Sequence, residues 1–485
     1  MTAVASLPGS IRAWISATTL PSPGVIAALL IAALAATLLL ATLMRRRSDA
    51  FALLAVFALP FRLPISAGGR TVNLLIPLYV VVAAGVLAHA LPWLLSWRNG
   101  QRAGAAREQG RGSTPRLIDA VVPLRRLSFW RSPRGLECLL LIAVVLYALQ
   151  ASYSADHGKA AENLAFFYLP FGLLFLLLRG VRFQRRLLLE CLGVIVAEAL
   201  LFSGVGFIEY YRKTLFLNPK VVAADQFDNY FRVNSLFFDP NIYGRFLMIV
   251  MIAVTTVVLW TRTRRDVRIG ALVLAWLLAG LVTSFSQSSI AALLLGLAIL
   301  AAYRWDVRAT VYVSGALLTI AAVFVAAAPA SLHFGLKGTG GSTSNATSGR
   351  GKLISGGLEL FADRPLEGYG SGSFETEYRR HQHANGENAT SASHTIPITV
   401  AAEQGIVGLA VYVALILAAL YVLFSGAGRS PPRIALAAIF AALVLHTWTY
   451  ADFLEDPMTW TILGIGVALA RAARTETPVP VVPVP

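Results

Sequence analysis

The sequence predicts an all-α polytopic membrane protein with about 12–13 transmembrane helices. Of its 485 residues, 56% are hydrophobic and only 14% are charged, and the mean hydropathy is +0.66. Runs close to the roughly 20 apolar residues that cross a bilayer recur along the whole chain, bounded by arginines or by Gly, Pro and Ser. These runs are continuous rather than alternating, and lipid offers the backbone no hydrogen-bond partner, so helices are favoured over a barrel.

The predicted spans follow one another from the first apolar run to the last. They cover residues 24–44, 51–66, 72–96, 137–153, 164–179, 187–210, 243–261, 269–285, 288–303, 309–329, 400–424, 434–453 and 457–470. The second, fifth and ninth are short for a membrane crossing. Their boundaries fall where charged or helix-breaking residues interrupt the apolar pattern.

Alternation of these spans places the arginine-rich segments on one side, which the positive-inside rule predicts to be the cytoplasm. These segments are Arg45 to Arg47, 97–136, Arg179 to Arg186, Arg262 to Arg268, Arg304 to Arg308, Arg429, Arg433, Arg471 and Arg474. The opposite side receives the loops 211–242 and 330–399 and every lysine. Most of the net charge of +16 is therefore explained by topology, and no nucleic-acid partner is expected.

The chain reads as a single integral membrane domain over residues 1–485, with an extended tail over 472–485. No disulfide framework is expected, because Cys138 and Cys191 fall in or beside predicted spans. The loop 330–399 is too long to be a simple connector. Within it, the apolar spacing from Leu353 to Phe361 predicts a short amphipathic helix at the membrane surface that ends before Pro365.

Two polar motifs stand out against this apolar background. The first runs from Arg232 through Ser235, Phe237 and Pro240 to Asn241. The second contains Arg350, the run Asp363-Arg364-Pro365-Leu366-Glu367-Gly368-Tyr369-Gly370, then Ser393-His394-Thr395, and finally Glu403-x-Gly405-x-x-Gly408. Together they resemble the signature regions of the O-antigen ligase and polymerase superfamily, loosely over 225–300 and more specifically over 349–410. Members of that superfamily are membrane enzymes that move glycans off a lipid diphosphate carrier.

The resemblance implies catalytic roles for His394 and Glu403. An imidazole titrates near neutral pH and can remove a proton from an attacking sugar hydroxyl. Glu403 follows about two turns later, where it can orient the imidazole or pair with an arginine. The structural alternatives are an interfacial histidine that caps a helix and a glutamate that faces a polar vestibule.

Arginines are the expected ligands of the diphosphate, because planar guanidinium groups pair with phosphate oxygens at two points and stay charged. Arg232 and Arg350 are the leading candidates, followed by Arg245 and Arg364. Arg245 lies inside the seventh span, where an arginine marks a functional site unless it snorkels to the surface.

The remaining candidates surround these arginines in the sequence. Asp239 is expected to support the site, or to cap the seventh helix or pair with Arg232. Asn241 completes the first motif. Gln287, in Ser284-Phe285-Ser286-Gln287, occupies the position where the superfamily often has an arginine, and it cannot supply positive charge.

The expected function is an O-antigen ligase-like glycosyl transfer from a polyprenyl-diphosphate-linked glycan to a glycolipid or glycan acceptor, on the outer face of a bacterial inner membrane. The alternatives are an O-antigen or exopolysaccharide polymerase of the same superfamily, and a transporter or flippase for a lipid-linked glycan. No cofactor or metal is expected: His381 and His383 have no acidic or cysteine partner at ligand spacing, and the resemblance implies a metal-independent reaction. Membrane lipids are the other expected partners.

Overall fold

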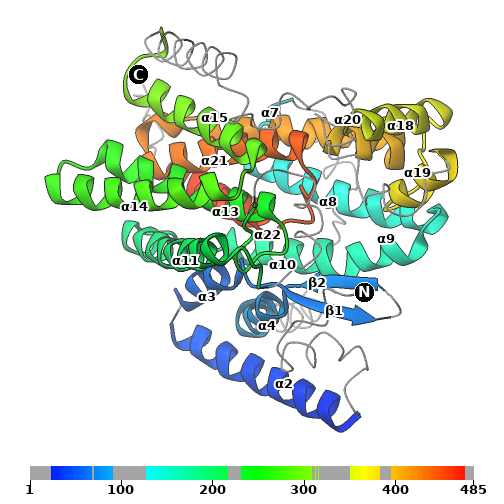
Figure 1. The fold of residues 1–485 in the computed structure, drawn as a ribbon, viewed down its shortest axis with the longest axis horizontal. Coiled ribbons are helices and arrows are strands. Elements are labelled where there is room, and N and C mark those ends of the chain that lie inside the picture. Colours follow the sequence, from blue (N-terminus) through cyan, green and yellow to red (C-terminus); the bar gives the residue numbers. More distant parts are fainter. Residues whose placement is uncertain are drawn as a thin grey trace, which may run out of the picture. The chain divides into compact units, whose positions relative to one another are not determined.

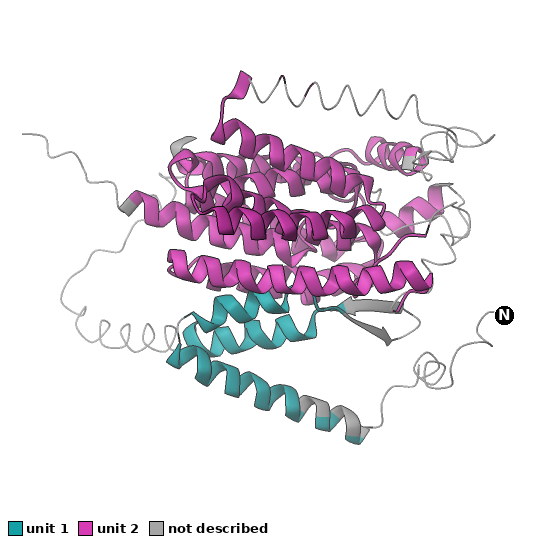
Figure 2. Ribbon diagram, turned by 60° about the vertical axis from the view of Figure 1, so that its left-hand side comes forward, with its two compact units in different colours: residues 1–104 teal, residues 105–485 magenta. Residues whose placement is uncertain are grey.

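The computed structural model describes residues 23–47, 49–67, 70–90, 127–216, 231–308, 350–382 and 395–475, together with the single positions 312 and 315. The chain forms two compact units, residues 1–104 and 105–485 (Figure 2). The prediction of one continuous membrane domain remains a prediction. His394 and most of the predicted span 309–329 lie outside the described residues.

The first unit corrects one predicted span. Its elements are α2 (Pro23–Arg46), α3 (Ala50–Ala58), β1 (Leu63–Ala67), β2 (Arg70–Leu74), α4 (Ile76–Gly85) and the π-helical turn η2 (Val86–Ala90). Residues 51–66 were predicted as one helix, but α3 ends at Ala58, and β1 pairs antiparallel with β2 from Leu63↔Leu74 to Ala67↔Arg70. Pro60 and Pro64 account for the break, because proline cannot donate a helical hydrogen bond.

In its described part, the second unit is built from helices joined by turns and loops. Its longer helices are α8 (Pro133–Gln150), α10 (Leu169–Leu178), α11 (Arg185–Arg212), α13 (Pro240–Trp260), α14 (Arg264–Thr283), α15 (Gln287–Arg304), α18 (Arg350–Asp363), α20 (Ile396–Phe424), α21 (Pro431–Thr449) and α22 (Pro457–Thr475). Shorter pieces are α7 (Leu127–Trp130), η5 (Ala151–Tyr153), α9 (His157–Asn163), η6 (Leu164–Tyr168), α19 (Phe374–Gln382) and η8 (Ala427–Arg429).

Among the described residues, eight helical segments are long and apolar enough to cross a membrane, and each coincides with a predicted span. They begin at Pro133, His157, Arg185, Pro240, Arg264, Gln287, Ile396 and Pro431. The all-α polytopic class is therefore confirmed, with the short β1–β2 hairpin as an addition. The helix α22 continues to Thr475, so residues 472–475 of the predicted tail are helical, and residues 476–485 lie outside the described part.

Helix α13 forms the centre of the second unit. It packs against α11, α14, α15 and α21, and α20 packs against α8, α18 and α21 (Figure 1). Gly244 allows α13 to approach α15 closely, since a Cβ there would lie 2.7 Å from the Ser289 hydroxyl. This close packing brings the first turns of α13 and α15 together.

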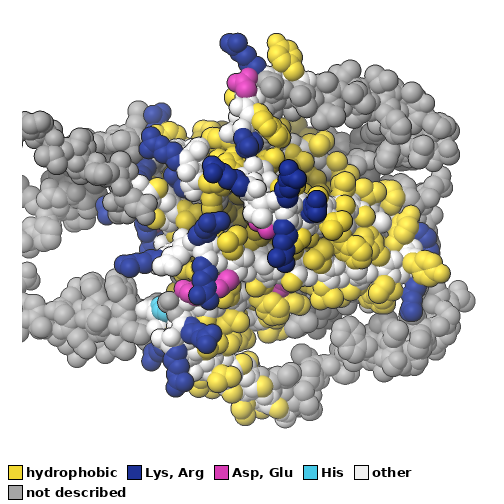
Figure 3. All heavy atoms as spheres, turned by 90° about the vertical axis from the view of Figure 1, so that its left-hand side faces the viewer, with side chains coloured by type: hydrophobic (Ala, Val, Ile, Leu, Met, Phe, Trp, Pro, Cys, Tyr) yellow, Lys and Arg dark blue, Asp and Glu magenta, His cyan; other side chains and the backbone are white. Residues whose placement is uncertain are grey.

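The helices of the second unit alternate in direction, so their ends gather at two opposite ends. The arginine end contains Arg131, Arg179, Arg262, Arg304, Arg429 and Arg474, and the Tyr303 and Phe424 rings stack there. Figure 3 shows a face of the molecule on which Lys and Arg side chains gather. The polar end contains Arg232, Asn241, Glu403, His446 and Asp456. The predicted site residues that the structure describes therefore belong to this polar end.

The predicted loop 330–399 contains α18 and α19. The predicted helix at Leu353 to Phe361 is confirmed as part of α18. Its apolar side is covered by protein, because Leu353 and Leu360 form a buried cluster with Tyr369, Phe374, Tyr378 and Ala402. The α18–α19 segment therefore packs on α20.

Candidate functional site

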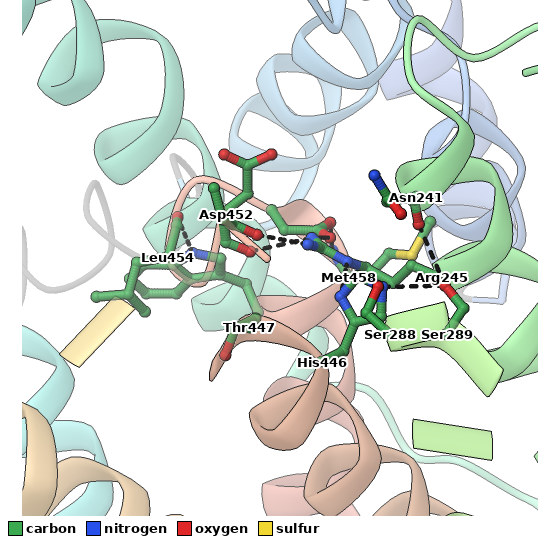
Figure 4. A network of polar contacts seen from close by, with 12 residues as sticks. Asn241, Arg245, Ser288, Ser289, His446, Thr447, Asp452, Leu454 and Met458 are labelled. Carbon is green, nitrogen blue, oxygen red and sulfur yellow. Dashed lines mark hydrogen bonds and ion pairs between the residues drawn. The ribbon is translucent and has the colours of Figure 1, made fainter. Parts of the chain in front are cut away.

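Arg245 is the centre of a buried polar network at the polar end (Figure 4). Its side chain is 0% exposed, and Nη1 lies 2.5 Å from Asp456 Oδ2. Nη1 and Nη2 also donate to the backbone carbonyls of Asp452 and Ala451. A desolvated guanidinium needs such partners, since an unpaired buried charge is very costly. Arg245 thus holds the 450–456 loop, and its buried side chain offers no exposed surface to a diphosphate.

His446, near the end of α21, connects this network to α15 (Figure 4). Arg245 Nε donates to His446 Nδ1 at 3.2 Å, so in the neutral imidazole Nε2 carries the proton. Nε2 lies 3.0 Å from the Ser289 hydroxyl and 3.3 Å from the Ser288 hydroxyl. The histidine is completely buried. Its contacts join three helices that are far apart in sequence.

Arg232 and Asn241 form the more exposed side of the same network. Arg232 Nη2 donates to Asn241 Oδ1 at 3.3 Å, and Arg232 Nε donates to the Ser284 carbonyl at 3.3 Å. Asn241 Oδ1 also accepts from the Ser286 hydroxyl at 2.9 Å. The Arg232 side chain remains half-buried, whereas Asn241 is buried. These contacts fix the guanidinium beside the N-termini of α13 and α15.

The segment before α13 is held by a buried carboxylate. Glu209, near the end of α11, accepts a hydrogen bond from the Ser235 backbone N–H at 2.7 Å. Ser235 has a positive φ of 53°, and its hydroxyl donates to the Phe202 carbonyl at 2.7 Å. Asp239 is the N-cap of α13, since its Oδ1 accepts from the Asn241 N–H. The capping alternative for Asp239 is therefore confirmed. The first motif forms a turn that these hydrogen bonds hold in place before α13.

The second motif is built around a break in α20. Gly405 has φ 63° and ψ −163°, which is not helical, so the carbonyls before it lose their helical partners. The Ala402 and Glu403 carbonyls instead accept from the N–H groups of Tyr369 and Gly370, and the Ile406 N–H donates to the Pro365 carbonyl. The run from Arg364 to Gly370 therefore fills the break in a membrane helix, where an unsatisfied backbone would be costly.

Glu403 serves the same assembly. Its Oε2 accepts from the Gly372 N–H at 2.9 Å, and its Oε1 accepts from the Phe374 N–H at 3.1 Å. The side chain is 7% exposed. Both oxygens thus bind the backbone at the start of α19, and the arginine partner that we expected for Glu403 does not appear among these contacts. This geometry assigns Glu403 to scaffolding of the motif.

A half-buried acidic group lies in the short segment between α21 and α22. Asn163 Nδ2 donates to Glu455 Oε1 at 2.9 Å. Burial, assisted by the Asp452 carboxylate and opposed by the Lys159 ammonium, raises the pKa of Glu455 to about 8. Burial also raises the pKa of the Tyr450 hydroxyl, assisted by the carboxylates of Asp239 and Asp452. Tyr450 therefore stays a neutral phenol beside Arg245, whose guanidinium lies 5.8 Å from the ring.

The other predicted residues divide into separate places. Arg364 is exposed, and its guanidinium lies 4.6 Å from the Tyr369 ring. Gln287 is the exposed first residue of α15, close in sequence to the Ser286 that bonds Asn241. Arg350 begins α18, and nothing more is described of it. The structure brings Arg232, Asn241 and Arg245 into one network, and His394 lies outside the described residues.

Sequence reasoning missed His446 and Asp456. A signal for each was present: His446 is an ionisable residue inside an apolar run, and Asp456 belongs to the acidic run Asp452-Phe453-Leu454-Glu455-Asp456 between two spans. Intramembrane ionisable residues mark a functional or structural site by default. Nothing in the sequence links either residue to Arg245, which lies 201 positions before His446.

Comparison with known proteins agrees with the second motif. Residues 272–413 match the family model described as O-antigen ligase, a range that runs from α14 through the break at Gly405. No curated protein is similar enough to count as a match. The matched range begins after Arg232 and Asn241 and ends before His446, so the network extends beyond it. Residues 272–413 of this multi-pass membrane protein are thus similar to the O-antigen ligase family.

Proposed function

We propose that this protein transfers a glycan from a polyprenyl-diphosphate donor to an acceptor hydroxyl, with the reaction at the polar end and without a metal. The observation that carries the proposal is the fixed, half-buried guanidinium of Arg232. It lies beside the first turns of α13 and α15, where the helix dipoles favour a nearby anion. A diphosphate leaving group fits such a site.

This arrangement also offers a replacement for the positive charge that Gln287 lacks. A guanidinium there would stand at the N-terminus of α15, close to the segment that Arg232 already contacts through Ser284. We therefore assign the positive charge to Arg232, assisted by Arg350, while Gln287 contributes amide hydrogen bonds only. Arg245 acts as a positioning residue, since its contacts are internal.

His394 is proposed to deprotonate or orient the acceptor hydroxyl. It stands one residue before the N-cap of α20, Thr395, in the segment that leads to Glu403 and the α20 break. As the hydroxyl oxygen attacks the anomeric carbon, the bond from that carbon to the diphosphate breaks. His394 takes the hydroxyl proton, and the arginines neutralise the charge that the diphosphate gathers.

The polar end is proposed to face outward from a bacterial inner membrane. The support is the gathering of arginines at the opposite end, which the positive-inside rule assigns to the cytoplasm (Figure 3). A ligase that delivers the glycan to a glycolipid is the favoured form. A polymerase would use a carrier-linked repeat as the acceptor.

The test uses purified protein with a polyprenyl-diphosphate glycan and two acceptors, a glycolipid and a second carrier-linked glycan. We expect Arg232→Gln and His394→Ala each to lower product formation by roughly 10²-fold or more, and Arg186→Gln, an exposed control at the arginine end, to leave it unchanged. Product on the glycolipid alone supports a ligase, and product on the second carrier supports a polymerase. Full activity in both site variants, or movement of intact donor across vesicles without transfer, rejects the mechanism.

A further inference from the structure

A cavity of about 620 Å³ lies at the arginine end of the second unit, far from the candidate site. It is bounded by the end of α20, the turn η8, the start of α21 and the end of α22, with Phe183 from the turn before α11. The 29-residue helix α20 separates it from the break near Glu403, at the other end of that helix. The cavity is therefore independent of the proposed transfer reaction.

Three arginines line this cavity: Arg429, Arg433 and Arg474. No carboxylate is among the described residues that line it. The nearby Glu137 already pairs with Arg179 and Arg471, so it does not supply the missing negative charge. Three like charges around one cavity repel one another unless an anion lies between them.

The three arginines differ in what they already bind. Arg433 is buried, and its guanidinium donates to the carbonyls of Ser425 at 2.7 Å and Gly426 at 3.3 Å, which caps the end of α20. Arg429 and Arg474 are exposed. In the described part of the chain, neither takes part in an ion pair. Helix capping thus gives Arg433 a local structural role, whereas only the positive-inside pattern accounts for Arg429 and Arg474.

The rest of the lining indicates which anion would fit. The hydroxyls of Ser425 and Ser430 are donors beside the arginines, and Phe183, Val422 and Leu469 supply apolar walls. Guanidinium forks and hydroxyls match phosphate oxygens, and basic pockets between membrane helices suit phosphate head groups. An apolar wall suits the glycerol and first carbons of a lipid.

We infer that this cavity binds a phosphate group through Arg429 and Arg474, with the head group of an anionic phospholipid as the favoured source and soluble phosphate as the other. Binding would hold the ends of α20, α21 and α22 together. Arg433 keeps its role at the end of α20.

Native mass spectrometry of the delipidated protein in detergent tests this inference. Phosphatidylglycerol and phosphatidylcholine are added separately, and the retained lipid is measured for the native chain, for Arg429→Gln/Arg474→Gln, and for Arg264→Gln/Arg265→Gln. The last variant removes the same charge from exposed residues of α14 outside the cavity. We expect the native chain and this control to retain phosphatidylglycerol, and the cavity variant to bind it about tenfold more weakly or worse.

A second arm adds inorganic phosphate at increasing concentration. If phosphate displaces the lipid, or binds with the same dependence on Arg429 and Arg474, then a soluble phosphate group is the source; if it does neither while lipid is retained, the source is the lipid. Two results overturn the inference: equal loss of lipid in both double variants, which is an effect of net charge alone, and retention of neither lipid nor phosphate by the native chain. Thermal unfolding of each variant verifies that it is folded.

Discussion

Arg245 on α13 and Asp456 before α22 form an ion pair in which both side chains are 0% exposed. Asp456 uses its other oxygen, Oδ1, to accept from the Met458 N–H at the start of α22. One carboxylate therefore positions a helix start and neutralises a buried guanidinium. Because Arg245 also binds His446 and two backbone carbonyls, this pair is the point through which four helices share one polar network.

Asp456→Asn is the first prediction. The substitution keeps the shape of the side chain but leaves the guanidinium of Arg245 without its counter-charge in a buried place. Breaking a buried pair from one side costs about 3–5 kcal/mol. We expect a loss of that order in unfolding free energy, measured by denaturant titration in detergent.

The control for this prediction is Arg186→Gln. Arg186 pairs with Glu190 across one helical turn, and its side chain is 88% exposed. Exposed pairs contribute little, so we expect a change within about 0.5 kcal/mol. A similar small change in Asp456→Asn would contradict the assignment of Arg245 and Asp456 as the central pair of the network.

Local patterns explain which parts of this molecule were predictable. Eight spans were found because each is a continuous apolar run with a charged or proline boundary, and Arg232 and Asn241 were grouped because both belong to one short motif that leads into the seventh predicted span. The hairpin after α3 was missed because the run 51–66 is apolar enough for a membrane helix, although Pro60 and Pro64 interrupt it. His446 and Asp456 were missed, because their partner Arg245 is brought to them only by the packing of α13 against α21.

The break in α20 was equally invisible, although its residues were singled out. Glycine is common in membrane helices, so Gly405 and Gly408 indicated no break by themselves. Only the structure shows that the Arg364 to Gly370 run fills the break. The described part of the motif, which led us to predict catalysis, therefore satisfies the backbone groups at the break in α20.

Gly405→Ala tests the role of this break in α20. Position 405 has φ 63° and ψ −163°, and a Cβ would lie 2.2 Å from the Leu366 carbonyl oxygen. Such a conformation is essentially restricted to glycine. We expect a loss of about 1–3 kcal/mol in unfolding free energy, or more if the Leu366 carbonyl cannot shift.

The matched control is Gly193→Ala, where a Cβ meets nothing within 4 Å. In that helix interior alanine should stabilise by up to about 1 kcal/mol. Equal effects at the two glycines would refute a special conformation at Gly405.

Glu403→Ala separates a scaffolding glutamate from a catalytic one. The substitution removes the acceptor of two backbone N–H groups, those of Gly372 and Phe374. We expect amide hydrogen exchange over residues 372–378 to accelerate by about tenfold or more, since each such bond to a charged group contributes roughly 1.5–3 kcal/mol. Glu359→Ala, an exposed glutamate on α18, is the control and should leave the exchange unchanged. Lost activity with unchanged exchange would instead return Glu403 to a direct role in the reaction.

The pH dependence of stability gives the last prediction, through Glu455. Its pKa in the folded protein is raised to about 8, chiefly by burial, so the folded state favours the protonated carboxyl. The unfolded chain has the ordinary value near 4.3. The stability that the protonated group contributes is therefore fully present below about pH 4.3 and is lost as the pH rises through 8.

Glu455→Gln keeps an oxygen that accepts from Asn163 and removes the titration. We expect the thermal midpoint of the native chain to fall by a few degrees relative to Glu455→Gln between pH 5 and 9. A difference that grows in the opposite direction would mean that the Lys159 ammonium outweighs burial at this site.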